Sequence, residues 1–250
     1  MKTVLIIGAS RGVGLGLTKA YAKNNEFDVY VTCRANEGEL KNVENITILK
    51  NIDIGSDEVI EKLKSDNVLP QRLDLVICNA GMKDSSQELH NLSKTDSMIN
   101  EYNVNALGPL RVAKGLENRL VKNSKLAFIG SMLASVSLVQ DNSPEMYLGY
   151  RMSKSGLNMA GKMLAVNWRD RGVLVGMFNP GVIQTEMSGF IGMPIETSVD
   201  QLVLNFEKLN AGNSGRVFNL FPGLLPYNGT GPFLGCFPEL EENGSDYLPW

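Results

Sequence analysis

Short apolar runs alternate with longer helical stretches along the first 220 residues of this chain, and this alternation limits the fold most strongly. The runs hold mostly apolar residues without strict alternation, which is typical of parallel strands buried on both faces. The predicted strands are Val4–Ile7, Val29–Thr32, Ile46–Leu49, Leu73–Cys78, Leu126–Ile129, Val173–Phe178 and Val217–Leu220. Helical patterns between them cover Gly12–Asn24, Asp57–Ser65, Asp96–Leu120, Tyr150–Asp170 and Val199–Leu209. This order predicts right-handed βαβ units, and therefore an α/β fold with a doubly wound, open parallel sheet.

The size and charge of the chain narrow its class further. A length of 250 residues suits one full α/β domain, so we expect residues 1–250 to form a single domain. A formal net charge of −3 leaves no basic face of the kind that binds nucleic acid. The apolar run Thr3–Ile7 is too short for a signal peptide, and no segment reaches the roughly 18 apolar residues of a membrane span. We therefore expect a cytoplasmic protein with neither a nucleic acid nor a membrane as partner.

Cysteine and histidine are scarce in this chain. Its three cysteines, Cys33, Cys78 and Cys236, show no Cys-x-x-Cys or Cys/His spacing, so we expect no metal site. A Ser/His/Asp hydrolase would have to use His90, the single histidine. His90 lies in a polar stretch, where a solvated loop histidine explains it equally well.

The last 30 residues differ from the rest in composition. They hold five of the ten prolines, namely Pro222, Pro226, Pro232, Pro238 and Pro249. This spacing excludes a long helix or a central strand, so we expect residues 221–250 to form an irregular extension rich in Pro, Gly and aromatic residues. The extension either packs on its own domain or serves as a substrate lid or a subunit contact.

A glycine-rich turn follows the first predicted strand directly. The turn reads Gly8-Ala-Ser-Arg-Gly12-Val-Gly14 and opens a predicted helix. In this position glycines permit a tight turn, a close approach of a pyrophosphate to backbone N–H groups, and close packing of helix on sheet. The turn thus predicts a dinucleotide cofactor, bound through Gly8, Ser10, Arg11, Gly12, Val13 and Gly14.

The second predicted strand ends in Thr32-Cys33-Arg34, where many dinucleotide-binding folds have an acidic residue for the ribose hydroxyls. Two guanidinium groups, those of Arg34 and Arg11, suit a 2′-phosphate instead. We therefore expect NADP(H) as the preferred cofactor and keep NAD(H) as the alternative. Either arginine alone could equally be a solvated surface charge.

Two further turns are expected to line the cofactor. Asp53-Ile54 follows the third predicted strand, where the carboxylate could accept a hydrogen bond from the adenine amino group. Asn79-Ala80-Gly81 follows the fourth strand, although Asn-x-Gly is also ordinary turn chemistry.

A tyrosine and a lysine lie four residues apart, in Tyr150-Arg-Met-Ser-Lys154, and so share one helix face. A cation within about 4–6 Å stabilises phenolate, so we expect Lys154 to lower the pKa of Tyr150 and make it a proton donor and acceptor. The pair alone is unspecific, because a chain with seven tyrosines can contain this spacing by chance.

Other residues at the same sheet edge make the pair specific. Ser131 follows the fifth predicted strand, where its hydroxyl could hydrogen-bond a substrate carbonyl. Asn105 lies inside a predicted helix, where Asn is a poor choice unless its side chain has a role. The turn after the sixth strand, Asn179-Pro-Gly-Val-Ile-Gln-Thr185, could hold the nicotinamide carboxamide, with expected contacts from Pro180, Gly181, Val182, Ile183 and Thr185.

Taken in order, these motifs resemble the short-chain dehydrogenase/reductase family over about residues 1–220. The shared motifs are Gly8-x-x-x-Gly12-x-Gly14, Asp53, Asn79-Ala-Gly81, Asn105, Ser131, Tyr150-x-x-x-Lys154 and Pro180-Gly181. The resemblance implies a Rossmann-type, three-layer αβα fold with a seven-stranded parallel sheet in the order 3-2-1-4-5-6-7. It also implies hydride transfer between a nicotinamide and a carbonyl or alcohol substrate.

The roles of the site residues follow from that resemblance. Tyr150 would protonate the substrate oxygen, Ser131 would polarise the carbonyl, and Lys154 would hold the nicotinamide ribose and depress the pKa of Tyr150. Asn105, through its backbone and a water, would connect Lys154 to solvent. The expected activity is an NADPH-dependent carbonyl reductase. The alternatives are an NAD-dependent alcohol dehydrogenase and a non-catalytic NADP(H)-binding signalling protein.

More narrowly, the segment Gly149–Asn158 and the ending Leu-Pro-Trp250 are similar to the C-factor/sniffer-like carbonyl reductases. That subgroup has an insertion before the tyrosine, which we expect here near Leu138–Leu148. The chain departs from the family at Ile7, in place of a threonine, and at Gly130, in place of a first serine; Ser135 is the fallback for Ser131.

The substrate itself is not predicted, beyond a small carbonyl or alcohol compound. Ser131, Tyr150 and Met187 are expected to contact it. An apolar pocket could be lined by Met146, Leu148, Met187, Phe190, Ile191 and Met193, although Met-rich stretches are often core filler. The long helices Asp96–Leu120 and Tyr150–Asp170 could pair across a two-fold axis in a homodimer or homotetramer, unless the C-terminal extension blocks them.

Overall fold

A seven-stranded parallel sheet is the centre of the structure, a computed structural model that describes residues 1–84, 92–139, 147–221 and 246–249. The strand order is β3-β2-β1-β4-β5-β6-β7, and all neighbouring strands pair in parallel. The strands are β1 (Lys2–Ile7), β2 (Phe27–Thr32), β3 (Ile46–Leu49), β4 (Leu75–Cys78), β5 (Lys125–Ile129), β6 (Leu174–Asn179) and β7 (Val217–Asn219). The predicted doubly wound sheet is therefore confirmed, and each strand lies within two residues of its predicted bounds.

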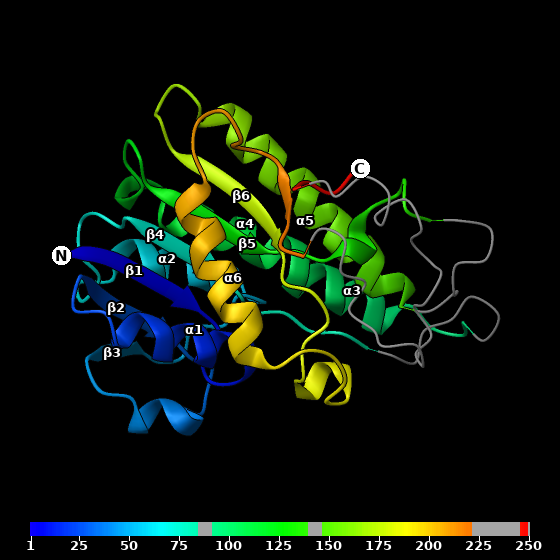
Figure 1. Ribbon diagram of the computed structural model, residues 1–250, viewed down its shortest axis with the longest axis horizontal. Helices are drawn as coiled ribbons and strands as arrows, with labels where there is room; N and C mark the ends of the chain where they lie inside the picture. Colours follow the sequence, from blue (N-terminus) through cyan, green and yellow to red (C-terminus); the bar gives the residue numbers. More distant parts are fainter. Residues whose placement is uncertain (85–91, 140–146, 222–245, 250) are drawn as a thin grey trace.

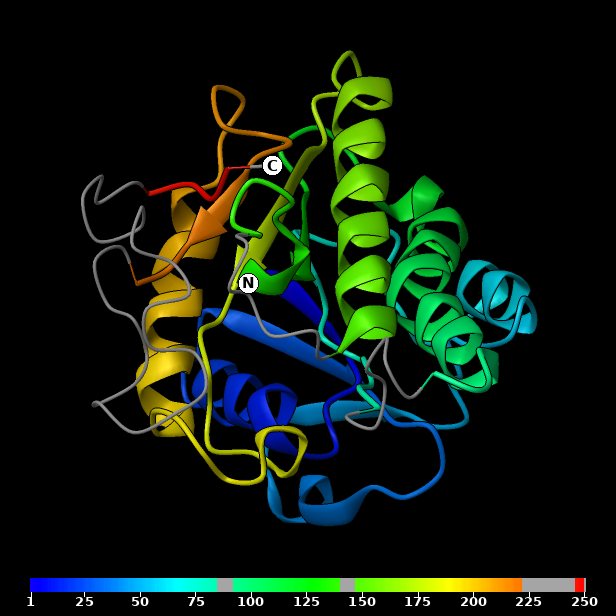
Figure 2. The same ribbon diagram turned by 90° about the vertical axis from the view of Figure 1, so that its right-hand side faces the viewer.

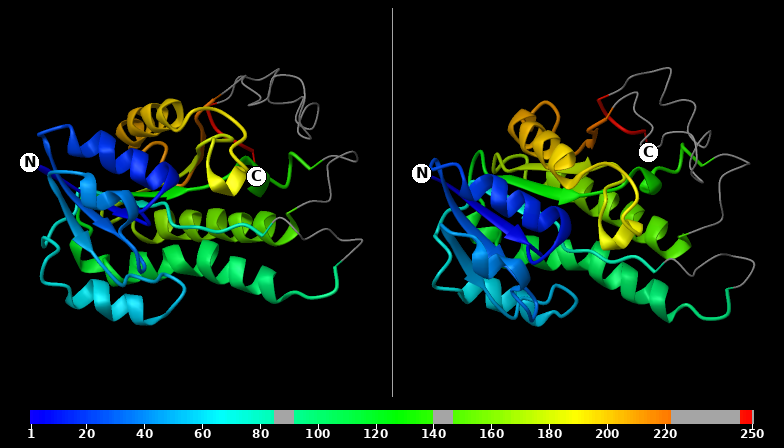
Figure 3. Two further views of the ribbon diagram at one scale, coloured as in Figure 1. Left: turned by 90° about the horizontal axis from the view of Figure 1, so that it is seen from below. Right: turned by 60° about the horizontal axis from the view of Figure 1, so that its bottom comes forward.

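Helices cover both faces of this sheet and give three layers (Figures 1 and 3). Helices α1 (Gly12–Ala22) and α6 (Ile195–Lys208) pack together on one face, over a core that includes Val4, Ile6 and Phe178. The other face carries α2 (Glu58–Ser65), α3 (Asp96–Tyr102), α4 (Gly108–Gly115) and α5 (Leu148–Asn167), as Figure 2 shows. Because both faces are buried, the strands are continuous apolar runs rather than alternating ones.

The helix predicted over Asp96–Leu120 is interrupted, and this part of the prediction was wrong. After α3 the chain makes a π-helical turn at Asn103–Leu107, in which the Gly108 N–H donates to the Asn103 carbonyl. It continues as α4 and ends in a 3₁₀ turn, Glu117–Arg119. Pro109 has no N–H, so the α-helical pattern of backbone hydrogen bonds cannot continue unbroken through it. This accounts for the irregular turn.

The helix α3 begins at Asp96, where the predicted helix begins, whereas the start of α6 differs from the prediction. The helix α6 begins at Ile195, directly after Pro194, four residues before the predicted Val199. Residues of α6 such as Val199, Leu202 and Phe206 pack in the core, and packing decides a helix boundary more strongly than local propensity does.

The described end of the C-terminal extension returns to the sheet. Tyr247 forms an antiparallel bridge with Phe218 in β7, and the Leu248 N–H donates to the Val217 carbonyl at 2.9 Å. Residues 222–245 and 250 of the predicted extension lie outside the described residues, as do residues 140–146 of the predicted insertion. Within the described ranges, no helix combines the length and the hydrophobicity needed to cross a membrane.

Candidate active site

The glycine turn between β1 and α1 can be built only with glycine at its key positions. Gly8 has φ of +81°, and a side chain there would also meet Ala80. A Cβ at Gly14 would collide with the Gly8 carbonyl oxygen and lie 2.6 Å from Asn79 Nδ2. The turn is thus held against the end of β4 with no room for side chains.

Two side chains anchor the turn to neighbouring strands. The Gly8 N–H donates to Thr32 Oγ1 at 3.0 Å, and Asn79 Nδ2 donates to the Gly8 carbonyl at 2.7 Å. Asn79 was predicted to line the cofactor, and the structure gives its side chain this anchoring contact. Thr32 was missed, although its place at the end of β2 beside the turn was a usable signal.

The N-terminus of α1 fits an anionic group. Among the described residues no side chain caps it, and its own first turn contains no acidic residue, which favours an anion at the backbone N–H groups there. Ser10 and Val13 are half-buried around this turn. The glycines, the uncapped helix and the backbone N–H groups together form a cradle suited to a pyrophosphate.

The two predicted phosphate-binding arginines differ in their surroundings. Arg11 forms an ion pair with Glu186, and both side chains are exposed. Arg34 is exposed after the end of β2. Glu186 is therefore a carboxylate that Arg11 would have to leave in order to bind a phosphate, a contact that sequence spacing could not reveal.

The Asp53–Gly55 turn is tied to the π-helical turn. Asp53 is exposed and accepts the Gly55 N–H at 2.9 Å, whereas Ile54 is buried. Asn103 Nδ2 donates to the Gly55 carbonyl at 2.8 Å, and Arg111 donates to the carbonyls of Ile54 and Asn103. The predicted adenine-side residues are thus rigidly connected to the helix that carries Asn105.

Tyr150 and Ser131 meet at the carboxyl edge of the sheet, as predicted. Tyr150 lies in the first turn of α5 and Ser131 directly follows Gly130 at the end of β5; each is 9% exposed. Burial raises the pKa of Tyr150 to about 12, while a hydrogen bond with Ser131 opposes that rise. The expectation that Lys154 lowers this pKa was wrong, because desolvation of the phenolate outweighs the other influences.

Lys154 is buried beside Tyr150. Its Nζ lies 5.7 Å from the centroid of the Tyr150 ring and donates to the Ile129 carbonyl at 2.8 Å. Burial lowers the pKa of Lys154 to about 8. The ammonium group is therefore held at the end of β5, close to the phenol, and loses its proton far more readily than an exposed lysine.

Asn105 joins three segments of the site. It is fully buried, its Oδ1 accepts the Met82 N–H at 2.8 Å, and its Nδ2 donates to the Met82 carbonyl and to Ser153 Oγ. Ser153, which sequence reasoning missed, donates in turn to the Tyr150 carbonyl at 2.8 Å. A Cβ on Gly81 would lie 3.1 Å from Asn105 Oδ1 and 3.6 Å from Lys154 Nζ. Gly81, Asn105 and Lys154 are thus brought together.

The loop after β6 approaches the glycine turn from the other side. Asn179 Oδ1 accepts the N–H groups of Met132 and Gly181, which ties this loop to the segment after Ser131. A Cβ on Gly12 would lie 3.5 Å from Thr185 Cγ2, so Thr185 faces the cofactor turn. Ser198 Oγ donates to the Pro180 carbonyl at 2.8 Å. Val182 is half-buried and Ile183 buried within the same loop.

One buried acid near the tyrosine was also missed. Glu101 in α3 is fully buried and accepts the Asp84 N–H at 2.7 Å. Burial raises the pKa of Glu101, and its carboxylate adds to the rise in the pKa of Tyr150. Its signal was weak, because an acid in a helix is usually solvated.

Several of the residues predicted to contact the substrate or to line its pocket are exposed. Met187 is 43% exposed on the 3₁₀ turn Glu186–Ser188, and Phe190 and Ile191 are also exposed. Met146 and His90 lie outside the described residues. The described site therefore offers a buried phenol, a hydroxyl beside it and a cradle suited to a phosphate.

Comparison with known proteins agrees with this geometry. Residues 2–193 match the family model described as short chain dehydrogenase. The fold is similar to that of the carbonyl reductase Sniffer of Drosophila melanogaster, with a TM-score of 0.77 and 27% identity over 88% of this chain and 97% of that one.

Two further relatives are similar over most of their length. A short-chain dehydrogenase/reductase from Burkholderia multivorans with bound NADP has a TM-score of 0.75 and 25% identity, covering 88% of this chain and 96% of that one. The 1-hydroxy-2-glutathionyl-2-methyl-3-butene dehydrogenase of Rhodococcus is 28% identical over 86% of this chain and 95% of its own length.

Proposed function

Because this chain belongs to the short-chain dehydrogenase family, and so is an NAD(P)-dependent oxidoreductase acting on alcohol or carbonyl groups, we propose that it is an NADPH-dependent carbonyl reductase. The observation that carries the proposal is the buried Tyr150 side chain, which lies beside Ser131 and close to Lys154. With a pKa of about 12 this hydroxyl is protonated at neutral pH, and it is still more acidic than the alcohol that carbonyl reduction forms. It is therefore suited to donate a proton in the direction of carbonyl reduction.

Each group of residues has its own role in the proposed reaction. The turn from Gly8 to Gly14 and the N-terminus of α1 hold the pyrophosphate, and Thr185, Ile183 and Pro180 line the nicotinamide end. The bound cofactor supplies the hydride. Ser131 orients and polarises the substrate carbonyl, and Tyr150 gives its proton to the oxygen as negative charge develops there.

Lys154 and Asn105 resupply that proton in our proposal. Lys154 lies 5.7 Å from the tyrosine ring centroid and has a pKa near 8, so it can give up and regain a proton. In an α-helix the Asn105 carbonyl would accept from residue 109, but Pro109 has no N–H. We propose that this carbonyl instead holds a water on the path from Lys154 to solvent.

The preference for NADPH rests on Arg34, because an exposed guanidinium at the end of β2 suits a 2′-phosphate. The similar Burkholderia structure with bound NADP supports this preference. The Arg11–Glu186 ion pair weakens the same argument for Arg11, since one exposed carboxylate already neutralises it.

We also propose that two copies of the chain pair through α3 and α5. Large apolar side chains are exposed on these adjacent helices: Ile99, Tyr102, Met152, Met159, Met163 and Val166. Their spacing along α5 places the four α5 residues on one stripe, as in helix–helix interfaces.

The activity is tested by following NADPH and NADH oxidation with a panel of aldehydes, ketones and quinones. We expect turnover of at least one carbonyl class, with a higher kcat/KM for NADPH than for NADH. Tight NADPH binding with no turnover across the panel would instead support the non-catalytic signalling alternative.

A further inference from the structure

A cavity lies at the opposite edge of the sheet from Tyr150. It has a volume of about 1210 Å³ and is open to solvent between α5 and the first residues of β5, β6 and β7. The loop Asn210–Gly215 and the C-terminal segment Tyr247–Pro249 complete its wall. In an open α/β sheet, cofactor and substrate bind at the carboxyl ends of the strands, so this cavity is separate from the proposed active site.

The wall of this cavity is charged with one sign only. Five cationic side chains line it, namely those of Lys122, Lys125, Lys162, Arg169 and Arg216, and no Asp or Glu belongs to the described lining. The chain as a whole has 27 acidic against 24 basic residues, so its composition does not explain this segregation. Concentrated positive charge in a concave, partly apolar surface raises the local concentration of anions.

One of these cations already has a structural role. Lys125 Nζ donates to the carbonyls of Phe206 and Glu207 at 2.8 and 2.9 Å, and so completes the C-terminal end of α6. Burial among these partners lowers the pKa of Lys125. Lys125 is therefore not counted among the cations available to a ligand.

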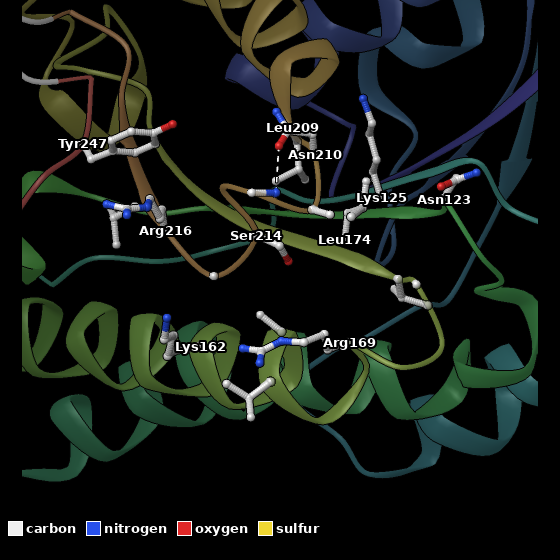
Figure 4. A pocket seen from close by; sticks show the side chains of 18 of the residues that line it. Asn123, Lys125, Lys162, Arg169, Leu174, Leu209, Asn210, Ser214, Arg216 and Tyr247 are labelled. Carbon is white, nitrogen blue, oxygen red and sulfur yellow. Dashed lines mark hydrogen bonds between the residues drawn. The ribbon is translucent and has the colours of Figure 1, made fainter.

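Of the other four cations, Lys162, Arg169 and Arg216 are the three directed at the cavity in Figure 4. Lys162 extends from α5 across the cavity to the loop Asn210–Gly215. A Cβ on Gly215 would lie 3.4 Å from Lys162 Nζ. The Arg216 guanidinium lies 4.9 Å from the centre of the Tyr247 ring, and Arg169 follows the end of α5. Among the ion pairs of the described residues, none neutralises Lys162, Arg169 or Arg216.

We propose that this cavity binds a small anion that carries two or more phosphate groups, held by Lys162, Arg169 and Arg216. Each of these cations is exposed, and a single exposed ion pair contributes little to binding. Three of them on two facing walls favour a ligand that presents several charges at once. The two guanidinium groups suit phosphate oxygens, which they can bind in a bidentate manner.

Calorimetric titration with inorganic pyrophosphate at low ionic strength tests this site. The parent chain should bind pyrophosphate at least about tenfold more tightly than it binds monophosphate, because only the former reaches several cations at once. In the double variant Lys162→Gln/Arg169→Gln, pyrophosphate affinity should fall at least about tenfold. Circular dichroism of the variant checks that it is folded.

Two controls separate the cavity from other sources of binding. The double variant Lys23→Gln/Lys94→Gln removes the same charge from exposed positions elsewhere and should change the affinity less than about twofold. A titration of the parent chain saturated with NADPH, which fills the proposed cofactor site, should retain pyrophosphate binding to the cavity.

Three results would overturn the proposal. The first is an absence of pyrophosphate binding to the parent chain, and the second is an equal loss in the cavity variant and the Lys23/Lys94 control. The third is the loss of all pyrophosphate binding when the parent chain is saturated with NADPH. The last would assign the binding to the glycine turn alone.

Discussion

At the Tyr150 hydroxyl two influences oppose each other: burial raises the phenol pKa to about 12, and the hydrogen bond with Ser131 lowers it. Burial prevails, so the group is a neutral acid across the physiological range. The same burial lowers the pKa of Lys154 to about 8. Of the two side chains, the lysine is thus the one that titrates near neutral pH.

This difference predicts the pH dependence of reduction. Burial depresses the pKa of Lys154, so its ammonium form dominates below about pH 8 and is lost as the pH rises above it. We expect kcat/KM for NADPH, which reports groups of the free enzyme, to fall tenfold per pH unit above about pH 8. A profile that stays flat from pH 7 to pH 10 would contradict a role for the Lys154 ammonium group.

The predicted preference for NADPH over NADH depends on the guanidinium group of Arg34. Changing Arg34→Asp removes a charge-assisted contact to a 2′-phosphate and adds a repulsive one, so the ratio of kcat/KM for NADPH to that for NADH should fall at least about tenfold. Lys23→Asp, the same charge change at an exposed residue after α1, is the control. If both variants keep the parent ratio, Arg34 does not select NADPH.

Among the elements, the π-helical turn Asn103–Leu107 has the clearest connection to the site. It places Asn105 against Met82 and Ser153, and it precedes Pro109, which cannot donate to the Asn105 carbonyl. A regular α-helix would engage that carbonyl with the N–H of residue 109. The irregular turn is therefore a structural reason for the proposed water path.

Pro109→Ala tests this reasoning. The new N–H can donate to the Asn105 carbonyl, so we expect kcat to fall at least about tenfold, part of a typical general acid–base effect, with NADPH affinity and Tm little changed. Pro194→Ala, at the start of α6, is the matched control. An unchanged kcat in Pro109→Ala would remove the Asn105 carbonyl from the proton path.

For the whole molecule, the exposed stripe on α5 and its neighbours on α3 predicts self-association. The two helices are closely packed, since a Cβ on Gly156 would lie 2.9 Å from the Tyr102 ring. Met152, Met159 and Met163 are each more than half exposed on the outer side of α5. A rigid, apolar, two-helix surface of this kind is suited to a two-fold contact.

The double variant Met159→Glu/Met163→Glu should convert a dimer or tetramer of the parent chain to smaller species in sedimentation velocity, because like charges would face each other across the axis. Lys23→Glu and Lys94→Glu, on other surfaces, should leave the sedimentation coefficient unchanged. A monomeric parent chain, or an assembly insensitive to the methionine changes, would contradict pairing through α5.

The sheet and its order were accessible from the sequence because they follow from buried apolar runs and from motifs that occur in a known order. Ser131, Tyr150, Lys154 and Asn105 could be predicted as candidate site residues, since each follows or lies within a recognisable element. These four residues meet at one edge of the sheet because the carboxyl ends of parallel strands point the same way.

What the sequence could not provide depends on contacts between distant segments. Arg11 and Glu186 are 175 positions apart, and no local pattern indicates their ion pair. The pKa of Tyr150 depends on burial by the whole fold, which is why a rule based on its lysine neighbour gave the wrong direction. The π-helical turn depends on tertiary hydrogen bonds of Asn103 and Asn105 as well as on Pro109.

The most direct test of the account is Tyr150→Phe, compared with Tyr147→Phe as a matched control on the same stretch of chain. NADPH binding, followed by fluorescence, should stay within about twofold of the parent in both variants, because neither hydroxyl forms the phosphate cradle. Turnover of a working carbonyl substrate should fall at least about 100-fold in Tyr150→Phe alone. Near-parent turnover by Tyr150→Phe, or a loss confined to Tyr147→Phe, would contradict the assignment of Tyr150 as the proton donor.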